Sequence, residues 1–447
     1  MKKSLMALAI LLSLAVAGIA AGFRYADDGK DQVTVTEQTI LGDPAMARGL
    51  ILETRYSYDN QIFWHTVCPV SAEPQPETEF RFYSIRQQTA REVENVLYLY
   101  AGNCSFGMSG SIDLEWEKEN ARIDGTMILP VLDVAGRTAA GEIRTETLSL
   151  RDYYDWFPIC MDGTLMLDIQ NEDEWAEKLN RLFPVPIPES LQVEVTVSRA
   201  ENGAVYEVNC QDVITDTPVW MSAECAVMED AVYLLPTGNV DFSHLPLGYG
   251  VYRIPRKASS QRVSETVLDL DQAENVFAVD PAQSQAVRLL QGLDEGELLI
   301  LEDSTGMMTV LDAARGEVRQ RLDLGQTTRA TVWRHENLLI LAFGLYEEET
   351  QLQVWQRENG AYHLWLETDM VPMNGDNAYM APVFAFDGRR LAVAAGLQTY
   401  QGVSHRAAVY DQTGAIYAGD YLYSCDNLPD PPHTWEVETP LLARWEK

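Results

Sequence analysis

Short apolar runs, each bordered by Gly, Asn, Asp or Pro, recur along most of the chain after its N-terminal segment. Runs of this length between turn residues are typical of β-strands. Helical periodicity stands out in one place, 171–183, where Trp175, Leu179 and Leu182 recur at helical spacing before Pro184. The pattern therefore predicts an all-β chain with one short helical insertion.

Seven of the apolar runs are alike, because each is a strand-like segment and most of them follow a turn residue. Consecutive runs lie between 40 and 68 residues apart. Recurrence at this scale indicates a repeat architecture, in which each unit buries its faces against its neighbours. The central positions of the seven runs are Leu50, Leu97, Leu165, Tyr233, Leu299, Leu339 and Ala392.

A second feature follows each of the last three runs. It is a strand, a tight turn ending in glycine and a return strand, at 310–318, 354–362 and 409–416. Glycine supplies the positive φ that such hairpins need. A buried inner strand followed by an outer hairpin is the pattern of a propeller blade, so we expect a β-propeller with seven irregular blades. The alternative fold is a β-sandwich followed by a smaller β domain.

Residues from about 290 to 420 resemble blades of the WD-repeat and quinoprotein-like β-propellers, in the irregular form found outside the cytoplasm. The inner strands at Leu299, Leu339 and Ala392, with the hairpins that follow them, carry this resemblance. The chain also resembles uncharacterised exported proteins of Firmicutes. The resemblance implies a rigid ring of blades whose loops contact a ligand or a protein partner.

The first 25 residues differ from the rest. Lys2 and Lys3 precede an uncharged run of 19 residues, which contains the small-x-small sequence Ala15-Val16-Ala17. These features are typical of a secretory signal, and the run is also long enough to span a bilayer. We therefore expect 1–25 to be a signal peptide or a signal-anchor helix. Residues 26–447 are then extracytoplasmic, either secreted or tethered to the membrane.

The charge balance narrows the choice of partners. The 447 residues include 33 Lys and Arg against 67 Asp and Glu, a formal net charge of −34. Nucleic acids and anionic membrane surfaces are bound by clustered basic residues, so the acid excess argues against both. We expect a protein or glycan partner, and contact with a membrane only through the N-terminal segment.

Six cysteines allow disulfides in an exported chain. Cys210 and Cys225 are nearest in sequence and form the candidate pair, with buried free thiols as the alternative. The histidines form no pair at metal-binding spacing, and 269–274 begins like a calcium loop but lacks its third ligand and its glycine. We therefore predict no metal site and no cofactor, with calcium between acidic loops as the remaining option.

Two clusters combine aromatic rings with Asp and Arg, at 55–65 and 151–157. Such clusters suit sugars or peptides, because the ring packs on C–H surface while the polar groups bind hydroxyls or amides. The alternative is that the rings fill space between neighbouring blades. The candidate ligand-binding residues are Tyr56, Tyr58, Trp64, Tyr153, Tyr154 and Trp156.

Catalytic motifs are missing from the sequence. Residues 107–111 do not complete a nucleophile elbow, because the last position is Ser111. We therefore favour an exported, non-catalytic propeller that binds a ligand or scaffolds a partner at the cell surface. The alternatives are a carbohydrate-active enzyme on the same fold, either a glycoside hydrolase or a lyase, and an accessory or sensory subunit of a membrane complex.

Overall fold

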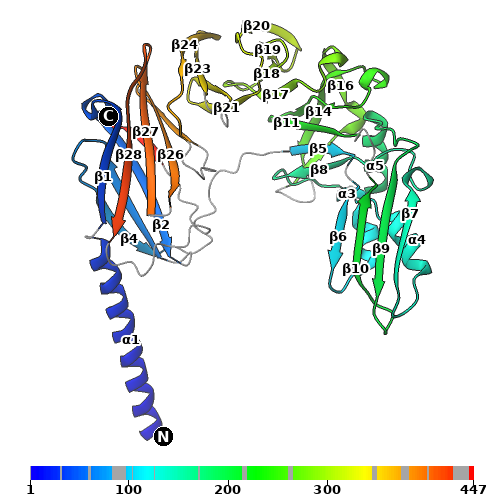
Figure 1. Cartoon of the computed structure of the whole chain (residues 1–447), viewed down its shortest axis with the longest axis horizontal. Coiled ribbons are helices and arrows are strands. Elements are labelled where there is room, and N and C mark those ends of the chain that lie inside the picture. Colours follow the sequence, from blue (N-terminus) through cyan, green and yellow to red (C-terminus); the bar gives the residue numbers. More distant parts are fainter. Residues whose placement is uncertain are drawn as a thin grey trace. The chain divides into compact units, whose positions relative to one another are not determined.

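The structure of the protein is a computed structural model. It is built mainly of antiparallel β-sheets, which confirms the all-β class. The chain forms two compact units, Met1–Glu92 with Arg329–Lys447, and Val93–Thr328 (Figure 1). The structure describes residues 2–30, 33–58, 62–82, 97–102, 104–124, 126–169, 172–213, 219–259, 265–344, 350–373, 382–399, 402–425 and 442–446.

The first unit contains the helix α1 (Lys2–Lys30), a short 3-10 turn at Pro44–Ala47 and, in its described part, three antiparallel sheets. In order across the sheet, the first consists of β1 (Val33–Gly42), β28 (Gly414–Cys425), β27 (Gly402–Asp411), β26 (Leu391–Thr399) and β25 (Val383–Phe386). The second consists of β29 (Leu442–Trp445), β2 (Leu50–Tyr58), β3 (Ile62–Pro69) and β4 (Glu77–Phe82). The third consists of β21 (Ala330–His335), β22 (Leu338–Phe343), β23 (Gln351–Glu358) and β24 (Ala361–Asp369).

The second unit contains three further sheets in its described part. One consists of β17 (Val287–Gln291), β18 (Glu297–Glu302), β19 (Met307–Asp312) and β20 (Glu317–Asp323). The largest consists of β15 (Thr266–Leu268), β14 (Gly250–Ala258), β12 (Ala231–Leu234), β11 (Met221–Val227), β5 (Leu97–Ala101) and β8 (Cys160–Gly163), with β16 (Glu274–Ala278) on β14 and β13 (Thr237–Gly238) on β11. The last consists of β6 (Phe106–Ser109), β10 (Val205–Asp212), β9 (Gln192–Arg199) and β7 (Ile143–Ser149).

Five of the seven central positions predicted from the sequence lie on a strand inside a sheet, three of them on the second strand of a four-stranded sheet, one in the five-stranded sheet and one in the largest sheet. These strands are β2, β12, β18, β22 and β26, and the positions are Leu50, Tyr233, Leu299, Leu339 and Ala392. Each of these strands is paired on both sides, and β22 is buried along its whole length. The predicted strands are therefore confirmed, but none of these five lies at the edge of its sheet. In each case one further strand pairs with its other side, namely β29, β11, β17, β21 or β25.

Within the first unit, the sheet of β25–β28 is covered on both of its faces. Leu391 of β26 packs in one apolar cluster with Ile340 of β22, whereas the next residue, Ala392, packs in another with Leu52 of β2. Alternate residues of a strand point to opposite faces, so this sheet lies between two others. Stacking of four-stranded antiparallel sheets face to face is the packing of propeller blades.

The predicted number of seven blades is not confirmed. Leu97 lies on β5, which extends the same sheet as β12, and Leu165 lies in a bend outside the strands. Most of the residues between about 104 and 213 form a helical insertion with its own four-stranded sheet, β6-β10-β9-β7, whereas β8 pairs with β5 in the largest sheet. The long spacings around Leu165 therefore reflect this insertion rather than two further blades.

The three predicted hairpins are confirmed as β19–β20, β23–β24 and β27–β28. In the first, Gly316 has a φ of +63°, which favours glycine. A Cβ at this position would lie 1.9 Å from the carbonyl oxygen of Val276. Close backbone approach and positive φ both require glycine at this turn.

Strands distant in sequence complete two sheets of the first unit. β1 pairs with β28 from Val33–Cys425 to Gly42–Tyr417, and β29 pairs with β2. The Arg390 guanidinium lies 4.0 Å from the Trp445 ring centroid and donates to the Met46 carbonyl at 2.9 Å. These pairings bring residues near 40 and near 445 into the same unit.

The insertion contains α3 (Leu114–Asp124), α4 (Leu129–Arg137) and α5 (Glu172–Leu182). α5 confirms the helix predicted at 171–183, whereas α3 and α4 were not predicted. α4 covers one face of its sheet, because it packs on β9 and β7 and buries Val131, Val134 and Ala135 (Figure 1). Short 3-10 turns lie at Leu150–Asp152, Phe242–His244, Leu270–Gln272 and Pro281–Gln283.

The N-terminal segment is one continuous helix, α1 (Figure 1). Large apolar side chains along it are exposed, among them Leu11, Leu14 and Ile19. Within the described ranges, none of the helices combines the length and apolar character needed to cross a membrane. The boundary at residue 25 stays a prediction.

Candidate functional site

The second aromatic cluster predicted from the sequence lies in the insertion, on the segment that follows β7. Leu150 and Phe157 are buried and anchor the segment in the core. The Phe157 N–H donates to the Val185 carbonyl at 2.9 Å, and Trp156 forms a β-bridge with Pro186. The proline-rich stretch after α5 therefore runs beside this segment on its way back to β9.

A cavity of about 280 Å³ opens between α3, α5, the start of α4 and this segment. Its volume is close to the lower end of the range for small-molecule sites. Helices and a loop each contribute part of the wall, so the insertion as a whole builds the cavity. Its lining residues are Lys118, Thr126, Ile128, Leu129, Tyr154, Pro158, Ile159, Ala176, Glu177 and Asn180.

Tyr154 is half-buried in the cavity wall. Its hydroxyl oxygen accepts a hydrogen bond from the Leu129 N–H at 3.0 Å, which satisfies one of the free N–H groups at the start of α4. Burial raises the pKa of Tyr154 to about 12. The phenol therefore keeps its proton at neutral pH and can donate it to a ligand.

The side chain of Asn180 is held by a hydrogen bond from the loop that contains Ile159. Its Oδ1 accepts a hydrogen bond from the Ile159 N–H at 3.2 Å, and Ile159 is almost fully buried. Only the oxygen of a carboxamide can accept from an N–H, so this bond fixes which end of the amide faces the loop. The amide N–H₂ group therefore faces away from the Ile159 N–H.

Two charged residues stand at the mouth of the cavity, Lys118 on α3 and Glu177 on α5. Glu177 is paired with Arg181 one turn further along α5, at 3.0 Å. No described residue pairs with the Lys118 ammonium group. Of these two lining charges, the one without an ion-pair partner among the described residues is therefore the positive one.

Tyr153 points to a different place from Tyr154. Its hydroxyl donates to Asp133 Oδ2 at 2.6 Å, and this carboxylate is paired with Arg137 at 2.8 Å. The Tyr153 hydrogen bond lowers the pKa of Asp133. Burial, helped by the Asp133 carboxylate, raises the pKa of Tyr153 to about 12.

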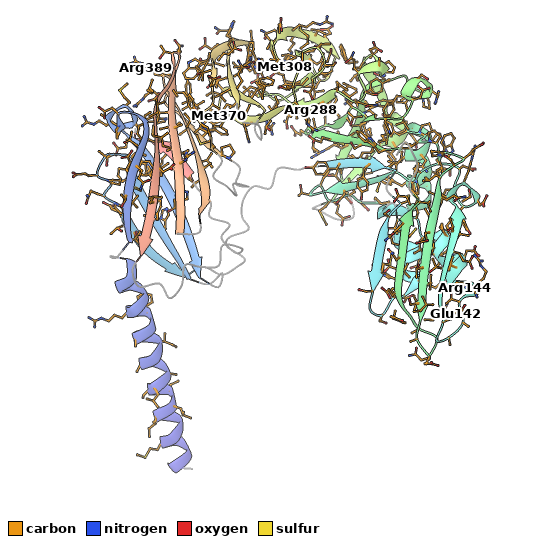
Figure 2. The ribbon with its side chains drawn as sticks, in the orientation of Figure 1. Glu142, Arg144, Arg288, Met308, Met370 and Arg389 are labelled. Carbon is orange, nitrogen blue, oxygen red and sulfur yellow. The ribbon has the colours of Figure 1, made fainter. Side chains whose placement is uncertain are left out.

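The ion pairs continue across the solvent-facing side of the insertion. Arg137 pairs with Glu146 at 2.5 Å. Arg144 pairs with Glu146 at 3.3 Å and with Glu142 at 3.1 Å (Figure 2). These exposed contacts link α4 to β7 and involve Tyr153, so this residue has a structural role.

The six predicted ligand-binding residues thus do not form one site in the structure. Tyr154 lines the cavity, Tyr153 joins the ion-pair network, and Trp156 is 43% exposed beside the proline-rich stretch. Tyr56, Tyr58 and Trp64 lie on the β2–β3 hairpin of the other unit, and their side chains are outside the described residues. The two clusters belong to separate units.

Several cavity residues were not predicted from the sequence. Lys118 lies on α3, a helix without a clear apolar period, and Thr126 lies just after it. Asn180 lies on the predicted helix, where an Asn among charged residues gives no signal of its own. Only the aromatic cluster around Tyr154 pointed to this part of the chain.

The cysteine prediction finds no support in the structure. Cys210 and Cys225 are free thiols on β10 and β11, strands of different sheets. Cys68, Cys104 and Cys160 are free as well. Burial raises the pKa of Cys210 to about 12, and the nearby Cys104 and Asp212 act in the same direction. Such a thiol is inert rather than reactive.

Side chains that could bind a metal do not cluster in the described part of the chain. No group of three or more His, Cys, Asp or Glu in the described ranges could hold a metal ion. In the stretch that resembles a calcium loop, Asp271 pairs with Lys178 at 2.6 Å and Asp269 accepts from Gln272 at 2.6 Å.

No family model and no curated protein matches the chain. Among solved structures, it is similar to the β-propeller domain of Cps50 (Swd1) from Myceliophteria thermophila, with 11% identity, 51% of this chain and 68% of that chain covered, and a TM-score of 0.23. For Hsv2 from Kluyvelomyces marxianus the values are 8%, 53%, 94% and 0.22, and for BamB from Moraxella catarrhalis 11%, 52%, 79% and 0.19. TM-scores this low carry no argument, so the fold rests on the sheets themselves.

Proposed function

We propose that the chain is an exported, non-catalytic binding protein in which blade-like sheets form the scaffold and the helical insertion carries the ligand site. The observation that supports this most is the cavity beside Tyr154. It combines an apolar wall with a few polar groups, the usual composition of a small-molecule site. A recognition element inserted into a rigid scaffold is also a common arrangement.

The geometry of the cavity favours binding over chemistry. Asn180 and Tyr154 are each tied to a backbone N–H, so their positions are fixed before any ligand arrives. Pre-organised polar groups reduce the entropic cost of binding. Among the described lining residues Glu177 is the one carboxylate, and it is paired with Arg181. The second carboxylate that a glycosidase needs opposite the first is not found among these described residues.

Export is the second part of the proposal. Lys2 and Lys3 followed by the exposed apolar side chains of α1 support a segment that enters the export machinery. The mature N-terminus can be read by mass spectrometry of protein from secreting cells. A start after residue 15–25 would indicate cleavage, an intact start in the membrane fraction would indicate a tether, and intact protein in the cytoplasm would contradict export.

Ligand binding is tested by thermal shift, using the full chain or its mature form. A ligand that binds the folded state raises the melting temperature by mass action, and a panel of small acids, amines, glycans and short peptides covers the main classes. Ala176→Trp should fill the cavity and abolish the shift. Glu174→Trp, on an exposed position of α5 outside the cavity, should keep it.

The two variants distinguish binding in the cavity from binding elsewhere on the protein. A shift that survives Glu174→Trp and is lost in Ala176→Trp would place binding in the cavity. A shift that is equal in both variants would move the site elsewhere. If no member of the panel changes the melting temperature, the cavity is not a small-molecule site and the proposal fails.

A further inference from the structure

Three polar groups of the cavity wall, on Asn180, Tyr154 and Lys118, have hydrogen-bond donors that no described residue uses. The Asn180 carbonyl oxygen is taken by the Ile159 N–H, which leaves the amide N–H₂. The Tyr154 oxygen is taken by the Leu129 N–H, which leaves the phenolic O–H. Lys118 adds an ammonium group with three donors.

A site with spare donors and a positive charge selects for a ligand with acceptors and a negative charge. We infer that the cavity binds a small carboxylate with an apolar body, an inference that rests on the proposed function of the same cavity. Charge-assisted hydrogen bonds from ammonium, amide and phenol to a carboxylate are shorter and stronger than neutral ones. Asn180, Tyr154 and Lys118 would hold the carboxylate.

The rest of the wall suits the other end of such a molecule. Ile128, Leu129, Pro158 and Ile159 are apolar, and Ile128 and Ile159 are almost fully buried. Burial of a branched aliphatic chain against them is favourable because it removes apolar surface from water. The volume of about 280 Å³ fits a short chain.

Two lining residues could oppose this reading. Glu177 would repel an anion, but its carboxylate is paired with Arg181 at 3.0 Å and is exposed to solvent, which screens its charge. Thr126 carries a hydroxyl that can donate as well as accept, so it is compatible with either kind of ligand. The selection therefore depends on Asn180, Tyr154 and Lys118.

The test uses a matched pair of probes, 4-methylpentanoate and 4-methylpentanamide, which differ only in the charged group. Isothermal titration of the protein should show that the acid binds and that the amide binds at least about tenfold more weakly. A short peptide ending in leucine, with a free or an amidated C-terminus, shows whether a chain end can supply the same carboxylate.

Two variants connect the preference to the residues. Asn180→Asp keeps the acceptor for the Ile159 N–H but replaces the donor with a negative charge, so the acid should bind at least about tenfold more weakly. Lys118→Met removes an exposed ammonium and should weaken the acid several-fold and remove most of its salt dependence. Glu174→Gln, outside the cavity, should leave both affinities unchanged.

Failure of this inference can be told apart from failure of the proposed function. If amides, amines or glycans bind and Ala176→Trp blocks them, while acids bind no better, the cavity is a binding site but not one for carboxylates. If acids bind but Asn180→Asp and Lys118→Met do not weaken them, the donors are not responsible and the inference is overturned. If nothing binds, both are wrong.

Discussion

The sheet of β21–β24 and the helical insertion within residues 104–213 are held together in different ways. β22 is a continuous run of buried apolar residues, paired on both sides and covered by the sheet of β25–β28. The insertion relies on single side chains that satisfy backbone groups, such as Asn180 to Ile159 and Tyr154 to Leu129. The repeated sheets are thus specified by pattern, and the insertion by individual contacts.

The largest effect should come from the repeated sheets. Leu339 on β22 is fully buried, and Leu339→Ala should lower the free energy of unfolding by about 2–5 kcal/mol, because it removes apolar contacts and leaves a cavity. Leu364→Ala in β24 of the same sheet, where the side chain is 45% exposed, should change it by under about 0.5 kcal/mol. Urea titration of both variants provides the measurement. Equal losses would mean that β22 is not the central strand of this sheet.

This difference also explains what could be predicted. The strands β18, β22 and β26 were found because continuous apolar runs between turn residues are a strong signal. Their partners β17 and β21 were missed, because burial along them is mixed and their side chains give no clear alternation. The turn at Gly316 was predicted as well, because a glycine at the end of a tight turn between two strand-like segments is also a local signal.

The insertion could be predicted only in part. α5 has a regular apolar period and a proline after it, whereas α3 is mostly charged and α4 is nine residues long. The cavity depends on contacts such as Leu129 with Tyr154, 25 residues apart, and no spacing rule encodes them. An aromatic cluster therefore located the region, but not the polar groups that complete the site.

The next largest effect should arise in the insertion. Asn180→Leu removes the acceptor of the buried Ile159 N–H, and an unsatisfied buried donor costs about 1–3 kcal/mol. Asn180→Asp keeps an acceptor oxygen and should cost less. Hydrogen exchange of peptides covering 150–160 should rise in Asn180→Leu and stay near the wild-type rate in Asn180→Asp. The reverse order would show that this bond does not hold the loop.

Acid should distinguish the insertion from the sheet of β25–β28 that covers β21–β24, because residues 104–213 contain no histidine. His405 in β27 is fully buried, and burial lowers its pKa to about 3. Its folded-state pKa lies below the unfolded value, so its neutral form is fully favourable above about pH 6.5. Stability is then lost as the pH falls from about 6.5 towards 3, by up to about 1.4 kcal/mol per pH unit.

His405→Gln tests this acid sensitivity. The free energy of unfolding of the wild type should fall between pH 6.5 and 5.5 by about 1 kcal/mol more than that of the variant, because the slope reaches its limit only below the unfolded-state pKa. Hydrogen exchange at the two pH values should locate the change in β26–β28 rather than in β9 and β10. An unchanged pH dependence in the variant would mean that other groups titrate in this range.

The smallest effect should come from the surface of the insertion. Arg151 and Glu189 form an ion pair at 2.6 Å, but their side chains are 50% and 87% exposed. Water and salt screen such a pair, so Arg151→Gln should change the free energy of unfolding by under about 0.5 kcal/mol, and by less in 0.5 M salt. Asn180→Leu is the internal contrast, because its contact is neutral and buried and its cost should not depend on salt. A loss above about 1 kcal/mol for Arg151→Gln would show that surface charge, and not the bonds from side chain to backbone, holds the insertion together.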